Sequence, residues 1–259
     1  MKFVRFAEQS AVCQGVIKDN TVEEITGDMF TDWTYTGRRF LVDDIKLLAP
    51  LEPKQIIGIG ANFVKHPQER PETLPQIPVF FFKPVSSVIG PDEEIVIPAG
   101  IEEVKFESEL AVVIGKETKN ISKDDVLDHV FGCTVGNDVT APQYLHEDGH
   151  WMVGKSFDTF TPLGPCIETD MNPLAVSVEA KLDGDEKQNS SVDCMIVPIQ
   201  EMIAYLSHVM TLQKGDVILT GSPLGAEMTR AGSTIECEIK DIGVLKNRFV
   251  KAKQGAASM

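Results

Sequence analysis

Three carboxylates offer the clearest chemistry in this sequence. Glu107 and Glu109 lie in the apolar run Val-Lys-Phe-Glu-Ser-Glu-Leu-Ala-Val-Val-Ile-Gly, and Asp138 follows in Gly-Asn-Asp-Val-Thr-Ala. Successive side chains of a strand point to opposite faces, so Glu107 and Glu109 share one face. Carboxylates this close raise one another's pKa unless a cation lies between them. Oxygen ligands of this kind suit Mg²⁺, Mn²⁺ or Ca²⁺, and the alternative to such a metal site is a solvated strand face.

Other polar side chains could take part in acid–base or anion chemistry. His66 offers an imidazole for acid–base chemistry, and Glu69 could orient it or share its protons. Lys83 and Lys155 follow apolar runs, so each either extends along apolar surface to solvent or faces a polar pocket. The segment 220–225, Thr-Gly-Ser-Pro-Leu-Gly, offers backbone N–H groups and hydroxyls to a carboxylate or enolate oxygen, or is a plain tight turn.

Two short motifs match known sites but lack the required context. His146-Glu-Asp-Gly-His150 has the letters of a zinc peptidase motif, yet that motif needs a helix, and Asp148 and Gly149 disfavour one. Gly58-Ile-Gly60 follows a strand-like run, but Phe63 stands at the third glycine position and no helix follows. We therefore interpret the first as a polar loop and do not expect a dinucleotide site at the second.

The elements that must position these residues are mostly strands. A small N-terminal β-unit is expected over residues 1–50, a linker around Pro50–Pro53, a larger domain over residues 54–250 and a tail over residues 251–259. Two helices are indicated, one opened by a capping box at Ser122–Asp125 and one amphipathic helix after Pro198. These features predict an α+β, predominantly β and mostly antiparallel fold. Strands are predicted at Lys2–Phe6, Cys13–Lys18, Thr21–Ile25, Gln55–Ile59, Val79–Phe82, Glu94–Pro98, Leu110–Ile114, Val176–Leu182, Asp216–Leu219 and Thr234–Ile239.

A long proline-rich segment, residues 66–78, separates two of the predicted strands. It has almost no apolar periodicity, so it is expected to be a surface loop. A loop of this length in a compact domain is either a plain connection or a lid or binding loop.

The composition excludes several classes of protein. The net charge of −15 argues against a nucleic-acid partner and against docking on an anionic membrane. Five scattered cysteines without a Cys-x-x-Cys pair indicate reduced thiols in a cytoplasmic protein. Neither a signal-type apolar region nor a run of membrane-spanning length is expected.

Six motifs in order make the chain, over about residues 54–250, resemble the fumarylacetoacetate hydrolase family. The short N-terminal unit resembles the variable extra domain of such proteins. The motifs are Gly-Ile-Gly-Ala-Asn-Phe-Val-Lys-His-Pro-Gln-Glu (58–69), Phe-Lys (82–83), Phe-Glu-Ser-Glu-Leu (106–110), Gly-Asn-Asp-Val-Thr-Ala (136–141), Gly-Lys-Ser-Phe-Asp-Thr-Phe-Thr-Pro-Leu-Gly-Pro (154–165) and Gly-Asp-Val-Ile-Leu-Thr-Gly-Ser-Pro (215–223).

The resemblance implies a mixed β-sandwich roll, usually a homodimer, that holds Mg²⁺ or Mn²⁺, or Ca²⁺ in some members. It implies that Lys155 stabilises an oxyanion and that Lys83, Gln143 and Ser222 lie at or near the substrate. His66 and Glu69 would form an acid–base pair on a lid. The implied metal ligands are Glu107, Glu109 and Asp138.

The same resemblance implies chemistry on a small anionic keto acid. A 2,4-diketo acid could chelate the metal, and a water activated by His66 and Glu69 would then cleave a C–C bond of an acylpyruvate-like compound. The runner-up is an isomerase, tautomerase or decarboxylase of hydroxyheptadienedioate or oxaloacetate type, because the same enolate serves those reactions. A metal-binding relative without turnover is a third possibility. Pro142 stands where the family often has an arginine that clamps an anionic group, which leaves the substrate open.

Overall fold

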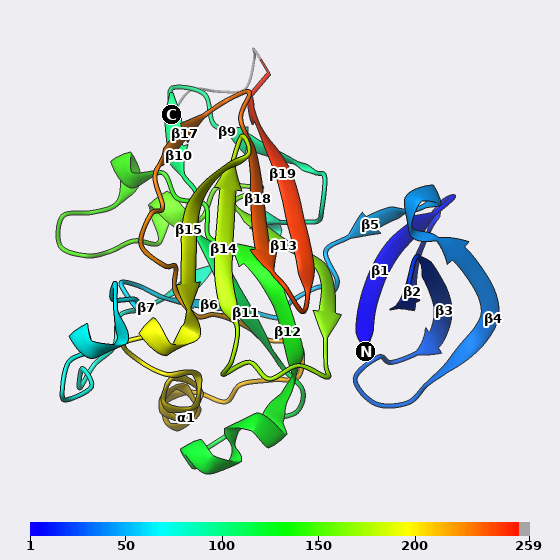
Figure 1. The fold of residues 1–259 in the computed structure, drawn as a ribbon, viewed down its shortest axis with the longest axis horizontal. Coiled ribbons are helices and arrows are strands. Elements are labelled where there is room, and N and C mark those ends of the chain that lie inside the picture. The colour runs from blue at the N-terminus through cyan, green and yellow to red at the C-terminus, as the bar shows by residue number, and fades with distance from the viewer. Residues whose placement is uncertain (254–259) are drawn as a thin grey trace.

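The N-terminal strands form an antiparallel meander joined by tight turns. In this computed structural model, which describes residues 1–253, the first two turns contain Gln9 and Asp19 with φ of 54°. The expected strands at the N-terminus are confirmed. In Figure 1 this unit stands to one side of the rest of the chain, and β1 pairs with β13 through Lys2 and Phe3. The four strands are β1 (Lys2–Glu8), β2 (Ala11–Lys18), β3 (Thr21–Gly27) and β4 (Trp33–Leu41).

The largest sheet runs in the order β4-β3-β2-β1-β13-β12-β11-β16-β6-β7, with β5 paired to β1 and β8 to β13. Most of its neighbours are antiparallel, as expected, while β16–β6 and β13–β8 are parallel. Its further strands are β5 (Lys46–Leu48), β6 (Ile56–Ile59), β7 (Phe80–Lys83), β8 (Val88–Ile89), β11 (Ser108–Ile114), β12 (Val130–Asn137), β13 (Thr161–Glu168) and β16 (Val217–Leu219).

A second sheet of five strands, ordered β15-β14-β18-β19-β9, faces the viewer in Figure 1, and β10 pairs with β17 beside it. Strand β19 includes Lys251, the first residue of the expected tail, and residues 254–259 lie outside the described residues. These strands are β9 (Glu94–Ile97), β10 (Glu103–Lys105), β14 (Ser177–Leu182), β15 (Asp185–Ser191), β17 (Met228–Arg230), β18 (Thr234–Ile239) and β19 (Gly243–Lys251).

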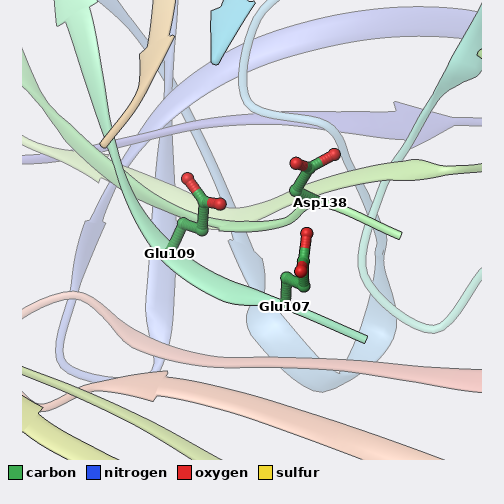
Figure 2. A group of neighbouring side chains, drawn as sticks. All are labelled: Glu107, Glu109 and Asp138. Atoms are coloured by element: carbon green, nitrogen blue, oxygen red, sulfur yellow. The ribbon is translucent and has the colours of Figure 1, made fainter. Parts of the chain in front are cut away.

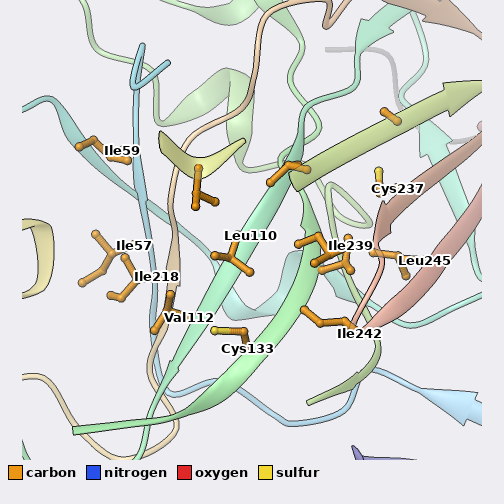
Figure 3. Close-up of a cluster of buried hydrophobic side chains, with 14 of the residues drawn as sticks. Ile57, Ile59, Leu110, Val112, Cys133, Ile218, Cys237, Ile239, Ile242 and Leu245 are labelled. Carbon is orange, nitrogen blue, oxygen red and sulfur yellow. The ribbon is translucent and has the colours of Figure 1, made fainter. Parts of the chain in front are cut away.

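The main core lies between the two larger sheets. Leu110 and Val112 of β11 pack there together with Cys237 and Ile239 of β18 (Figure 3). Ala111 lies on the other face of β11, in a second buried cluster. Every residue of β11 is buried, so this strand is an uninterrupted apolar run behind its polar first residues. The protein is a predominantly β fold of two packed sheets, as predicted.

One α-helix, α1 (Ile199–Val209), covers part of the core and follows Pro198 as predicted. The expected capping box is wrong: the segment forms a 3₁₀ helix, and Ser122 Oγ accepts no hydrogen bond from a backbone N–H but donates to Asp125 Oδ2 at 2.7 Å. Within residues 1–253, no helix is both long and apolar enough to cross a bilayer. The 3₁₀ helices are η1 (Val42–Asp44), η2 (Pro67–Glu69), η3 (Val85–Ser87), η4 (Lys123–His129), η5 (Pro142–Tyr144), η6 (Val153–Lys155) and η7 (Val192–Cys194).

Candidate metal centre and active-site pocket

The pairing of β11 with β12 brings the three carboxylates together. Glu109 lies opposite Gly136, and beyond the strand ends the N–H of Asp138 donates to the carbonyl oxygen of Glu107 at 2.8 Å. Asp138 therefore faces Glu107, and Glu109 follows two residues along the same face. One carboxylate oxygen from each residue lies within 4.8 Å of the others. Figure 2 shows the three side chains directed toward a common space.

Glu109 is the least compensated of the three carboxylates. It is 2% exposed, and its Oε2 accepts a 2.7 Å hydrogen bond from the N–H of Gly221. Burial, followed by the charges of Asp138 and Glu107, raises the pKa of Glu109 well above its usual range. Among residues 1–253, no lysine or arginine nitrogen lies within ion-pair distance of it. A cation between the carboxylates would supply the missing positive charge.

Lys155 contacts the other two carboxylates. Its Nζ donates to Glu107 Oε2 at 2.8 Å, to Thr140 Oγ1 at 2.9 Å and to Asp138 Oδ2. Burial lowers the pKa of this lysine, but the charges of Asp138 and Glu107 outweigh it and hold the pKa above the usual value. Lys155 is therefore a buried ammonium group at the edge of the carboxylate cluster.

Lys83 lies behind Asp138 rather than at the substrate. Its Nζ donates to Asp138 Oδ1 at 2.6 Å and to the backbone carbonyl oxygens of Val139 and Lys155 at 3.2 and 2.8 Å. Its side chain is fully buried, and burial lowers its pKa. All three ammonium hydrogens are thus used inside the protein. The geometry gives Lys83 a positioning role for Asp138 in place of the expected substrate contact.

A pocket of about 440 Å³ opens above the carboxylates. Lys105 lines it, and its Nζ donates to Glu107 Oε1 at 2.9 Å. Lys105 was not among the site residues expected from the sequence, although it precedes Glu107 by two positions and the period of an extended chain places both on one face. Besides the three carboxylates, the polar side chains of the lining belong to Lys105, Thr140, Lys155 and Ser222.

The expected acid–base pair does not reach this pocket. His66 and Glu69 are exposed at the 3₁₀ helix η2 and are absent from the pocket lining. Gln143 is exposed as well, and its Nε2 donates to the carbonyl oxygen of Glu103 at 3.0 Å. These three residues sit on connections between strands, where no ladder of backbone hydrogen bonds fixes their position.

The turn after β16 donates its backbone hydrogen bond to a carboxylate of the cluster and not to a ligand. The N–H of Gly221 is occupied by Glu109, and Gly221 has a φ of 93°, which a side chain would strain. Ser222 lines the pocket, and its Oγ accepts a 2.7 Å hydrogen bond from Gln188 Nε2. Gln188 therefore orients the one hydroxyl that this turn presents to the pocket.

The His146–His150 segment is the polar loop that the sequence indicates. The N–H of His146 donates to the carbonyl oxygen of His150 at 3.1 Å, which closes a turn instead of a helix. The centroids of the two imidazole rings are 6.1 Å apart, and the side chain of His146 is 64% exposed. Within the described residues, the carboxylate cluster is the one group of three or more His, Cys, Asp or Glu residues with metal-ligand proximity.

The carboxylate cluster fits a hard divalent cation. All three donors are oxygens, two of them are almost completely buried, and the third side chain, Glu107, is 15% exposed toward the pocket. Neither a thiol nor an imidazole belongs to the cluster. This donor set matches Mg²⁺, Mn²⁺ or Ca²⁺ rather than zinc or copper.

Comparisons with known proteins agree with this geometry. A mitochondrial oxaloacetate tautomerase of Xenopus laevis is 41% identical over 220 residues, which cover 80% of this chain and 69% of that protein. The structure of 5-carboxymethyl-2-hydroxymuconate delta-isomerase from Mycobacterium smegmatis superimposes with a TM-score of 0.91 at 35% identity, over 97% of this chain and all of that chain.

A maleylpyruvate hydrolase from Sphingobium sp. SYK-6, solved with manganese(II) and pyruvate, gives a TM-score of 0.82 at 27% identity, covering 98% of this chain and all of that chain. The profile of the Rv2993c-like N-terminal family matches residues 1–50. The profile of the fumarylacetoacetate (FAA) hydrolase C-terminal domain matches residues 55–250. The chain therefore belongs to the fumarylacetoacetate hydrolase family.

Proposed function

We propose that this protein is an enzyme that catalyses divalent-metal-dependent keto–enol tautomerisation of a small 2-keto acid of the oxaloacetate type. The observation that carries the proposal is the cluster of Glu107, Glu109 and Asp138 on the floor of a small pocket beside Lys155. The name of the Xenopus laevis relative, oxaloacetate tautomerase, supports this choice of reaction. We propose Mg²⁺ or Mn²⁺ as the metal, with Ca²⁺ as a further possibility.

The charges of the pocket favour a dianionic substrate. The three carboxylates are matched by three lysines that contact them, Lys83, Lys105 and Lys155. A bound divalent cation would therefore give the site a net charge of +2. A dicarboxylate such as oxaloacetate has a charge of −2 and would neutralise it. Lys105 is the least buried of the three lysines, with 36% of its side chain exposed, and is placed to bind the distal carboxylate. This lysine could take the part of the arginine that Pro142 replaces.

Each group of the chain then has a role in the reaction. A divalent cation, when bound, supplies Lewis-acid polarisation of the 2-keto group. Lys155 donates its three hydrogens to Glu107, Asp138 and Thr140, so it stabilises negative charge on the substrate oxygen through its positive charge as the C3–H bond breaks. The electron pair of that bond forms the C2–C3 double bond, and the oxygen is protonated, so no atom is gained or lost. Glu107, Glu109 and Asp138 would hold the metal, while Lys83 orients Asp138.

The base that takes the C3 proton is proposed to be His66 with Glu69. Both lie in the segment 63–78, which is exposed over residues 65–77 and starts at Phe63, a buried residue of the pocket lining. Closure of this segment would bring the pair over the substrate and exclude water. The test is hydrogen exchange of residues 63–78 with Mn²⁺ and oxalate. We expect protection of this segment, and unchanged exchange despite demonstrated oxalate binding would contradict the closure.

Hydrolysis of a C–C bond in an acylpyruvate is the second candidate. It is favoured by the likeness to the maleylpyruvate hydrolase solved with manganese(II) and pyruvate. The same His66–Glu69 pair would activate water in place of removing a substrate proton. The two reactions differ in their products, so a product assay separates them.

The test of the proposed function is ultraviolet absorbance over a panel of oxaloacetate, acetylpyruvate, fumarylpyruvate and a hydroxydienedioate. Each compound is followed with Mg²⁺ or Mn²⁺, with EDTA, and with the Glu109→Gln variant, with the exposed Glu117→Gln as the matched control. We expect enol–keto conversion of oxaloacetate that EDTA and Glu109→Gln abolish and that Glu117→Gln leaves unchanged. Cleavage of an acylpyruvate instead would select the hydrolase, and no metal-dependent reaction would overturn the proposal.

We also propose that the protein is a homodimer. Light scattering coupled to size exclusion is expected to give twice the chain mass of 28.5 kDa. A single species at the chain mass would contradict the dimer.

A further inference from the structure

Two glycines at the end of β6 each lie directly against an aromatic ring. A Cβ built on Gly58 would overlap Cζ of Phe81, and one built on Gly60 would overlap Cζ3 of Trp151. Neither glycine has a positive φ, so the absence of a side chain is required by the close approach of the rings and not by backbone conformation. The two glycines of the Gly58-Ile-Gly60 motif therefore leave the room in which two aromatic side chains pack against the backbone.

The two rings form a continuous wall. The centroids of Phe81 and Trp151 are 6.0 Å apart with planes at 60°, a tilted arrangement common for packed aromatics. Phe81 also lies beneath the ammonium group of Lys155, whose Nζ is 4.6 Å from the ring centroid. The wall thus adjoins the site at which Lys155 contacts Glu107 and Asp138.

This wall lies between two cavities. Trp151 lines the pocket above the carboxylates and also lines a neighbouring groove of about 640 Å³. The groove is mostly apolar, with Phe81, Phe82 and Met152 among its residues, and Gln143, His146 and His150 also line it. Leu145 lines both cavities, so Trp151 and Leu145 are the shared boundary.

The loop that contains the two histidines sets the position of Trp151. The hydrogen bonds from His146 N–H to His150 O at 3.1 Å and from Gly149 N–H to His146 O at 3.0 Å close the loop immediately before the tryptophan. Gly149 has a φ of 85°, which suits such a closed turn. The closed loop therefore holds the indole ring of Trp151 in contact with Gly60.

We infer that Trp151, seated on Gly60, is the residue that determines substrate size by closing the metal-site pocket against the adjacent apolar groove. With the indole in place, the pocket takes a small keto acid. With the indole removed, the pocket and groove join, and a bulky apolar substituent at C3 gains room. The choice of substrates rests on the proposed function, whereas the packing of Trp151 on Gly60 does not.

The packing is tested by a double-mutant cycle in thermal unfolding. Gly60→Ala should lower Tm by about 5 °C because the new methyl group overpacks against the indole. The same change in a Trp151→Ala background should lower Tm by less than about 1 °C, since the ring is gone. Equal shifts in both backgrounds would overturn the seating of Trp151 on Gly60.

The size inference is tested with oxaloacetate and phenylpyruvate, two 2-keto acids that differ in the substituent at C3. Trp151→Ala should raise the ratio of kcat/KM for phenylpyruvate to that for oxaloacetate by about tenfold or more. The matched control is Met152→Ala, because Met152 adjoins Trp151, is 61% exposed and lines the groove but not the pocket. A ratio that stays unchanged in Trp151→Ala, or rises equally in Met152→Ala, would overturn the inference.

A binding measurement separates failure of this inference from failure of the proposed function. If none of the proteins turns over either compound, the proposed function fails, and calorimetry with Mn²⁺, oxalate and phenylpyruvate decides the size question. A gain of about tenfold in phenylpyruvate affinity relative to oxalate in Trp151→Ala supports the inference. No gain overturns it.

Discussion

The bottom and the rim of the active-site pocket are built in different ways. The carboxylate floor is defined as Glu107, Glu109, Asp138 and the two lysines Lys83 and Lys155. Four of these residues lie in strands or directly beside them, Lys155 ends the 3₁₀ helix η6, and the group is almost entirely buried. The loop rim, residues 61–78 and 142–153, consists of connections and short 3₁₀ helices with mostly exposed side chains. We therefore propose that the floor is preformed for a metal and that the rim selects the substrate and closes over it.

The difference follows from the backbone hydrogen bonds of each region. The floor inherits the register of β11 and β12, in which Ser108 pairs with Asn137 and Glu109 with Gly136. The rim has no ladder, and a few turns fix it locally, such as Leu145 N–H to Pro142 O at 3.1 Å. Regions with few backbone bonds open at low free energy, which suits a lid and not a metal site.

The largest expected effect is on the stability of the floor. Asp138→Asn removes the charge that the fully buried Lys83 faces, so we expect a loss of about 3–5 kcal/mol in the free energy of unfolding. Urea unfolding measures it, with the exposed Asp124→Asn as the matched control. A loss below about 1 kcal/mol would show that the floor is not held by this ion pair.

The next largest effect separates catalysis at the rim from metal binding at the floor. His66→Ala should lower kcat by about 100-fold while Mn²⁺ affinity stays within about twofold of the parent protein. The exposed His208→Ala, at the end of α1, serves as control. A parallel loss of Mn²⁺ affinity would show that His66 contributes to metal binding, and would contradict the separation of catalysis at the rim from metal binding at the floor.

A smaller effect is expected at Lys105, which lines the pocket beside Glu107. Lys105→Ala should raise KM for oxaloacetate about tenfold with little change in kcat, because the lysine binds substrate without stabilising the developing charge. Steady-state kinetics measure both constants, and the exposed Lys116→Ala is the control. A fall in kcat with KM unchanged would instead assign Lys105 to transition-state stabilisation.

The smallest effect is expected at the histidine loop. His150→Ala should leave metal affinity and turnover within about twofold, because the His146–His150 segment is a turn and not a metal-binding helix. Loss of metal from His150→Ala, with Glu109→Gln unaffected, would revive the zinc interpretation and contradict the account of the floor.

The strand period allowed only part of the floor, Glu107 and Glu109, to be placed on one face from the sequence, while the role of Lys155 was implied by the family resemblance. Glu107 and Glu109 alternate with buried residues, and Lys105 obeys the same period although it was overlooked. The contact of Lys83 with Asp138 could not be read in this way. The contact depends on the order of strands in the sheet, in which β11, β16 and β6 separate β12 from β7. Local periodicity does not reveal the order of strands.

The rim was the less predictable part of the site. Trp151 lies in a loop with no periodic pattern, and its contact with Gly60 joins segments far apart in the sequence. The glycine spacing of residues 58–60 was noticed, but only the structure relates it to Phe81 and Trp151. The capping box at Ser122 was also wrong, because the Ser122 and Asp125 side chains bond each other and Ser122 Oγ accepts from no backbone N–H.

The most direct measurement is calorimetric titration of Mn²⁺ into the metal-free protein, Glu109→Gln and Glu117→Gln. The account predicts one strong site per chain in the parent protein and in Glu117→Gln, and a loss of affinity of at least about 100-fold in Glu109→Gln, beyond what an outer-shell partner costs. Equal Mn²⁺ affinity in all three proteins would contradict the central claim that Glu107, Glu109 and Asp138 form the metal centre.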